Sequence, residues 1–131
     1  MDPAGQQSLF VRTAEDARRL LAPVFDGAEV ERIGVLHLDG ERRLLGVGEF
    51  EGGFDAVELP ARLLFGEALR LGAEGLVVAH NHPSGDAGPS ESDRRATRIL
   101  AETGERLGIL LHDHLIFARA ECRSLRALGL L

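Results

Sequence analysis

The chain has 131 residues, with 15 Lys and Arg against 21 Asp and Glu and a formal net charge of −6. This length corresponds to one domain with an ordinary core, and 44% hydrophobic with 27% charged residues exclude a disordered or fibrous protein. The acidic balance argues against strong binding of nucleic acid, which normally needs a basic face. The single cysteine, Cys122, excludes an internal disulfide and a Cys-rich metal cage.

Targeting and membrane signals are not found in the sequence. The N-terminus has no cationic start and no apolar run of signal length, and no segment approaches the ~20 apolar residues needed to cross a bilayer. We therefore expect a soluble cytoplasmic protein without a membrane segment. Residues 1–10 are expected to be a flexible tail, and residues 11–131 the folded domain.

Hydrophobic periodicity and turn residues predict alternating helices and strands. In chain order we expect a helix from residue 14, strands over 30–38 and 43–50, a helix over 60–71, a strand over 75–80, a helix over 90–107 and a strand over 109–118. Thr13 and Asp16 form the pattern of a capping box at the first helix, which should end before Pro23. Asp39-Gly40 indicates a two-residue turn between the first two strands.

The later elements predict the fold class. The run 75–80 is short, continuous and apolar, which is typical of a strand buried on both faces. A helix and a further strand follow it, so we expect a crossover unit within a mixed α/β fold whose helices pack on a sheet. The helix over 60–71 should bury Leu63 with other apolar residues and end at Gly72. Residues 124–130 are compatible with either a strand or a short helix.

The residues that can carry chemistry gather between positions 80 and 93. His80 and His82 are separated by one residue at a strand end, so their side chains project to the same side. Asp93 lies in the first turn of the following helix, and a loop with two Pro and two Gly would return that helix to the histidines. Two imidazoles and one carboxylate are a common ligand set for a catalytic zinc, which keeps a fourth position for water.

The same residues also have a purely structural interpretation. Ser90-x-x-Asp93 is the pattern of an N-terminal capping box, which explains both residues without a metal. A pair of histidines beside a loop is usually polar surface, and short motifs carry a risk of false positives. The two interpretations are compatible, because Asp93 can face a metal while Ser90 caps the helix. Spacing alone leaves the choice open.

The order of these residues resembles a known family signature. His80-x-His82, followed after seven residues by Ser90-x-x-Asp93, looks like the signature of the JAMM (JAB/MPN+) metalloproteases. The fuller string His80-Asn81-His82-Pro83-Ser84-Gly85 resembles the RadC branch of that family, and agreement extends over roughly residues 28–126. Downstream it includes Gly108-Ile109, Asp113-His114-Leu115-Ile116 and Ser124-Leu125-Arg126. We expect a JAB domain alone, without the helix-hairpin-helix region that longer RadC proteins carry.

The resemblance implies a JAB/MPN fold, a mixed sheet flanked by helices with a layout similar to that of cytidine deaminases. It implies that His80, His82 and Asp93 bind Zn²⁺. It also implies that Ser90 donates a hydrogen bond to the metal water or to a developing oxyanion.

A glutamate from the first sheet strand would be the general acid and base. Alignment of that strand with the family places Glu31 at this position, and Glu49 on the partner strand is the reserve candidate. The alternative for Glu31 is an ordinary solvated carboxylate at a strand edge.

The function implied by the resemblance is a zinc-dependent hydrolase of peptide or isopeptide bonds. Its substrate would be a protein or peptide, such as a ubiquitin-like or small carrier protein. A second hypothesis is a zinc-binding interaction module in DNA repair or mobile-element biology that catalyses little. Deamination of nucleobases needs H-x-E and P-C-x-x-C patterns, which the sequence does not contain, so we reject it.

Other polar residues have less certain roles. Asp113-His114 is either a buried hydrogen-bonded pair or a support for a metal ligand. His37 and His112 fall in predicted strands, where we expect core or edge histidines, and Cys122 is expected to be a packed side chain. An exposed sheet edge or the apolar segment 128–131 would support a homodimer, so the oligomeric state stays open.

Overall fold

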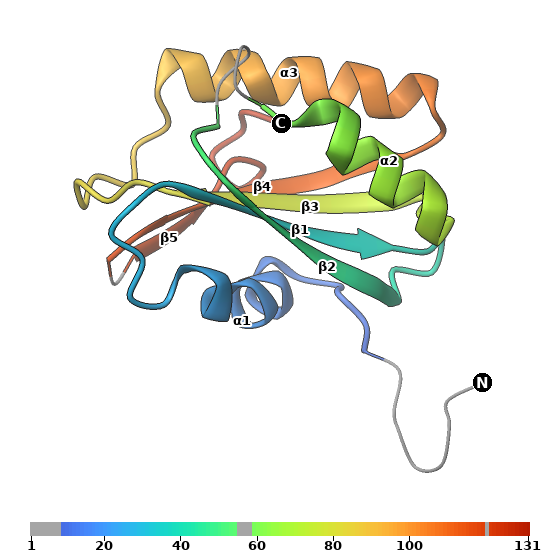
Figure 1. Cartoon of the computed structure of the whole chain (residues 1–131), viewed down its shortest axis with the longest axis horizontal. Coiled ribbons are helices and arrows are strands. Elements are labelled where there is room, and N and C mark those ends of the chain that lie inside the picture. The colour runs from blue at the N-terminus through green and yellow to red at the C-terminus, as the bar shows by residue number, and fades with distance from the viewer. Residues whose placement is uncertain (1–8, 55–58, 120) are drawn as a thin grey trace.

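A computed structural model of the chain describes residues 9–54, 59–119 and 121–131. In chain order the elements are α1 (Ala14–Phe25), β1 (Arg32–Leu38), β2 (Leu44–Glu51), α2 (Ala61–Leu71), β3 (Gly75–Asn81), α3 (Glu91–Arg106), β4 (Leu110–Ala118) and β5 (Glu121–Ser124). The strands form one sheet in the order β2-β1-β3-β4-β5, with α1 on one face and α2 and α3 on the other (Figure 1). The predicted mixed α/β fold in a single domain is confirmed. In these described ranges no helix is both long and apolar enough to span a membrane.

The sheet combines antiparallel and parallel pairs. β1 is antiparallel to β2 and β3, β3 is parallel to β4, and β4 is antiparallel to β5. The unit β3–α3–β4 is the predicted crossover connection. β3 is the central strand, and all seven of its residues are buried, as expected for a strand covered on both faces.

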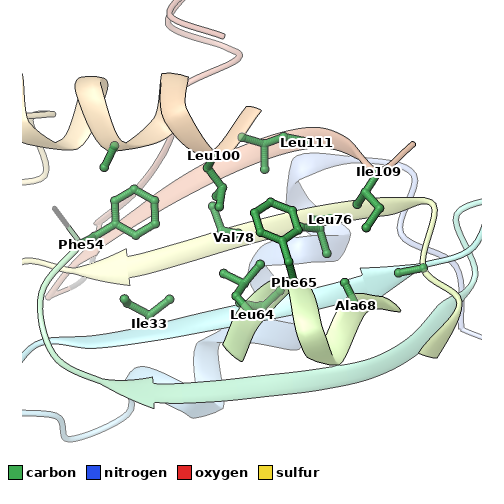
Figure 2. Packing of buried hydrophobic residues seen from close by; sticks show 13 residues of the cluster. Ile33, Phe54, Leu64, Phe65, Ala68, Leu76, Val78, Leu100, Ile109 and Leu111 are labelled. Carbon is green, nitrogen blue, oxygen red and sulfur yellow. The ribbon is translucent and has the colours of Figure 1, made fainter. Parts of the chain in front are cut away.

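Two hydrophobic clusters hold the helices against the sheet. Under α2 and α3, Phe54 and Phe65 pack with Ile33 and Leu100 (Figure 2). On the other face, Leu21 of α1 packs with alternate sheet residues such as Leu36, Leu38 and Val77. Because side chains alternate along each strand, odd-numbered residues of β1 face α2 and even-numbered residues face α1.

A bulge in β4 sets which face each of its side chains occupies. Leu76 pairs with Leu111 and Val77 with Asp113, so His112 is the extra residue. A bulge places successive side chains on one side and restores the alternation beyond it. His114, opposite Val78, therefore faces α2 and α3.

The first helix does not end before Pro23, contrary to the prediction, but continues to Phe25. Proline removes one helical hydrogen bond, and packing of the last turn compensates for it. Val24 is buried, and the ring of Phe25 stacks on Phe117 at a centroid distance of 4.7 Å.

The predicted hairpin is confirmed, but its turn is longer than expected. The Arg42 N–H donates to the Asp39 carbonyl at 3.0 Å, so Gly40 and Glu41 are the central residues. Arg42 then takes the positive φ of 69°. The Asp39 carboxylate accepts from the backbone N–H groups of Glu41 and Arg43, an Asx arrangement that stabilises this longer form.

Three further expectations differ from the structure. Leu63 is 64% exposed, and the neighbouring Phe65 is buried in its place, so the apolar face of α2 is rotated. The last strand, β5, precedes most of the segment 124–130, which forms turns. Residues 9 and 10, expected in the tail, pair with the hairpin through the Leu9 carbonyl and a bridge from Phe10 to Arg43. Residues 1–8 of the expected tail lie outside the described part.

Candidate metal centre

The sequence motif comes together where β3 ends and α3 begins. His80 is the penultimate residue of β3, His82 follows the strand, and Asp93 lies in the first turn of α3. The connecting loop is anchored by the buried side chain of Ala87, which packs against Ile116. The loop therefore returns the helix to the histidines, as predicted.

The three side chains converge on one point. The distance from His80 Nε2 to Asp93 Oδ1 is 3.1 Å, and from His82 Nε2 to Asp93 Oδ2 it is 3.0 Å. The two Nε2 atoms are 3.0 Å apart. A tetrahedral metal with bonds of about 2.0–2.1 Å separates its ligands by about 3.4 Å, so small shifts bring all three into range. The described residues contain one such group that could hold a metal ion, His80 with His82 and Asp93.

The tautomer of His82 follows from its outer hydrogen bond. His82 Nδ1 is 2.7 Å from the carbonyl oxygen of Asp86, and a carbonyl only accepts. Nδ1 therefore carries the proton, and Nε2 of the neutral ring presents a lone pair.

A relay of three residues determines the tautomer of His80 in the same way. The Thr97 hydroxyl donates to the Asp93 carbonyl at 2.6 Å, which uses its only hydrogen, so it accepts from His114 Nδ1 at 2.6 Å. His114 Nε2 is then an acceptor and receives a bond of 2.7 Å from His80 Nδ1. His80 Nε2 is consequently also left with a lone pair.

These assignments bring two lone pairs and a carboxylate together with no proton between them. Burial raises the pKa of Asp93, but a proton and positive charge on His80, whenever that ring is protonated, together with the Ser90 N–H and a charged His82 outweigh burial and hold it well below its usual range. Asp93 is therefore a carboxylate at neutral pH. Acceptors facing one another repel unless a cation lies between them, so the donor set fits a divalent cation such as Zn²⁺.

The capping box and the ligand geometry occur together. Ser90 Oγ accepts from the Asp93 N–H at 3.0 Å, and the Ser90 N–H donates to Asp93 Oδ2 at 2.9 Å. Asp93 Oδ1 still faces His80. The cap uses Ser90 Oγ only as an acceptor, so the hydrogen of the hydroxyl stays available to donate.

The side chains around the centre keep it dry and oriented. The ring of Phe54 stacks on His80 at 5.0 Å and lies 4.3 Å from the ring of His114. His114 is fully buried and supports a ligand, whereas Asp113 accepts hydrogen bonds from Ser124 and from the backbone of Arg126. The His114 N–H also donates to Asp113 Oδ1, so the two residues form a buried hydrogen-bonded pair, and His114 in addition contacts the candidate ligand His80.

The two candidate glutamates lie on different sides of the sheet. Glu31 lies just before β1 and lines a pocket of about 520 Å³ together with His82, Ser90 and Asp93. Glu49 pairs with Gly34, next to the pair Ile33–His80. Because neighbouring pairs point to opposite faces, Glu49 points toward the α1 side and away from His80.

Asn81 has a role that the sequence analysis missed. Its Oδ1 accepts from the Arg32 N–H at 2.7 Å, and its Nδ2 donates to the Val30 carbonyl at 3.0 Å. One side-chain amide thus fixes the backbone on both sides of Glu31. An asparagine between two candidate ligands was the available signal.

The remaining candidates are structural. His37 is fully buried, as expected for a core histidine, and neither ring nitrogen has a hydrogen-bond partner among the described residues. Burial raises the pKa of the Cys122 thiol to about 11, so it is protonated at neutral pH. This agrees with a packed side chain rather than a nucleophile.

Comparisons with known proteins agree with the fold and the motif. The family described as RadC-like JAB domain matches residues 11–130. A UPF0758 protein of Rhodobacter capsulatus is 40% identical over 102 residues, which are 77% of this chain and 48% of that protein. A UPF0758 protein of Flavobacterium johnsoniae is 30% identical over 115 residues, or 87% of this chain and 50% of that protein. The chain thus spans about half the length of these curated relatives, and it belongs to the RadC-like JAB domain family.

Proposed function

We propose that this domain is a zinc-dependent hydrolase of peptide or isopeptide bonds. The observation that carries the proposal is the convergence of two imidazole lone pairs and a carboxylate in a pocket that Glu31 also lines. When bound, Zn²⁺ supplies a nucleophile at neutral pH by lowering the pKa of its water toward ~7, and it polarises a carbonyl.

Glu31 is the proposed general acid and base. It would accept the proton of the attacking water and pass it to the leaving amine. Its placement supports this role, because the Asn81 amide holds the residues on both sides while the exposed carboxylate stays at the pocket.

Ser90 is the proposed donor to the oxyanion. Its oxygen is held by the cap at the start of α3, and Ser90 lines the same pocket as Glu31. A donor already oriented toward developing charge contributes on the order of 3 kcal/mol to transition-state stabilisation.

The surface around the centre supports an extended substrate. A second hollow of about 490 Å³ is lined by Glu29, Glu51 and Gly53 and shares Glu31 and Pro83 with the first pocket. A peptide would therefore have room on both sides of the reacting bond. We propose a protein or peptide substrate, with ubiquitin-like tails and small carrier proteins as the classes to test.

Zinc content and cleavage test this proposal together. Elemental analysis of purified protein should give about one zinc per chain, and His82→Ala should abolish it. Glu31→Gln should keep the zinc and lose cleavage of fluorogenic peptides or ubiquitin conjugates by about 100-fold or more. Glu49→Gln is the matched control, because this residue points away from His80.

The outcomes separate the hypotheses. Cleavage that survives chelation of the metal would contradict the proposal. Zinc binding without cleavage in either class of substrate would favour the interaction module instead.

A further inference from the structure

Another pocket, separate from the two beside the candidate metal centre, lies on the α1 face of the sheet, away from the face that carries the His80 side chain. Its volume is about 530 Å³, within the range of small-molecule sites, and it lies between the start of α1, the hairpin turn, the start of β4 and the C-terminal turn. Three arginines from three separate parts of the chain line it, Arg12, Arg42 and Arg126.

Within the described part of the chain, the positive charge of these three arginines exceeds the negative charge of the pocket lining. In the described ranges, these three arginines form no ion pair with a carboxylate within 4.0 Å; the ion pairs found there involve other arginines. Asp113 is the one acidic residue in the lining. Its oxygens already accept from Ser124 and from the backbone N–H groups of His114 and Arg126.

Arg42 and Arg126 are held through Nε, and Arg12 through the face of its guanidinium group. Arg42 Nε donates to the Val11 carbonyl at 2.8 Å, and Arg126 Nε donates to the His112 carbonyl at 2.5 Å. The Arg12 guanidinium lies over the Phe10 ring, 4.2 Å from its centroid. These contacts orient the guanidinium groups while their terminal nitrogens stay available to a ligand.

His112, at the bulge of β4, also lies close to two of these arginines. Burial lowers the pKa of His112, and the charges of Arg42 and Arg126 lower it further. Two guanidinium groups thus lie close to one neutral imidazole. Thr13, also in the lining, accepts from the Asp16 N–H and keeps its hydroxyl hydrogen to donate.

We propose that this pocket binds the phosphate group of a small phosphorylated molecule. Planar guanidinium forks bind phosphate oxygens in pairs, and three arginines with one buried aspartate leave a charge that matches a phosphate dianion. The volume exceeds that of the phosphate alone, so the pocket has room for a phosphate monoester up to nucleotide size. The elements that form the site place it apart from the metal centre, so it is independent of the proposed hydrolase.

Calorimetry on the zinc-loaded full chain tests this proposal with three probes at one ionic strength: AMP, inorganic phosphate and glutamate. AMP should bind, and Arg12→Gln combined with Arg126→Gln should weaken it by about tenfold or more. Arg95→Gln combined with Arg106→Gln, which removes two charges from α3, should bind AMP like the wild type. If AMP instead binds through its phosphate at the metal centre, neither double variant should change its affinity.

Chemical-shift changes of backbone amides, measured by NMR as AMP is added, locate the bound ligand. Shifts at Thr13 and His112 on adding AMP support the site, and equal affinity for inorganic phosphate supports the phosphate group as the whole determinant. Equal affinity for glutamate, shifts confined to the metal centre, or unchanged AMP binding by the double variant would each overturn the proposal. If the double variant does not fold, Arg12→Gln alone decides, because its side chain donates no hydrogen bond within the described chain.

Discussion

The tautomers of His80 and His82 are decided by partners that never touch a metal. For His80 the chain of donors runs through His114 and Thr97 to the backbone of α3. For His82 a single loop carbonyl suffices. Such outer partners raise ligand basicity and fix ring orientation, so we expect metal affinity at this site to depend on residues outside the motif.

Replacing His114 tests this dependence. His114→Phe removes the acceptor for His80 Nδ1, and we expect zinc affinity to fall by about 10–100-fold, measured by competition with a chelating dye. His37→Leu is the control, because His37 is an equally buried histidine without a polar partner among the described residues. Equal zinc affinity in wild type and His114→Phe would contradict the relay.

At the scale of elements, the described residues contain two capping boxes with different surroundings. Thr13 and Asp16 cap α1, and Ser90 and Asp93 cap α3 with the same geometry. The first lies away from the metal centre, whereas the second also supplies a candidate ligand. Comparing the two capping boxes therefore distinguishes the structural role of a cap from a chemical role.

Removing each cap should give different results. Thr13→Ala should lower the free energy of unfolding by about 1 kcal/mol and leave cleavage unchanged. Ser90→Ala should cost a similar amount of stability and lower kcat by about 100-fold or more, because it also removes the oxyanion donor. Denaturant unfolding and steady-state kinetics measure the two effects. Equal kcat in both variants would exclude a chemical role for Ser90.

For the whole molecule, His37 links stability to pH. Burial lowers the pKa of His37; the charge of Glu67 opposes this effect, and the smaller contribution of Arg70 adds to it. The unfolded chain therefore binds a proton near the ordinary value of about 6.5, while the folded chain does not. Stability is retained above that pH and lost as the pH falls below it.

His37→Leu should remove this acid sensitivity. It also deletes two buried polar atoms that have no partner in the described ranges, so we expect a gain of about 1–3 kcal/mol at pH 8. From pH 8 to pH 5 the wild type should lose more stability than the variant, measured by denaturant unfolding. Parallel losses in both proteins would show that His37 does not carry the effect.

The local sequence pattern was sufficient to predict features that depend on residues close together in the chain. Strand alternation placed His80 and His82 on one side, and a Pro- and Gly-containing loop implied the return of Asp93. The crossover over β3, α3 and β4 followed from an apolar run, a helix and a strand in succession. Pro23 shows the limit, because packing by Val24 and Phe25 outweighed the local rule.

By itself, then, the order of residues determined the architecture and the three candidate ligands, since both depend on periodicity and on neighbours within about a dozen positions. Only the tertiary structure placed Glu31 at the pocket of the candidate ligands and Glu49 on the α1 side, because the face of a side chain depends on strand register. It likewise brought Asn81 to Val30 and joined three arginines around one pocket. These contacts link residues far apart in sequence, and no local pattern encodes the distance between them.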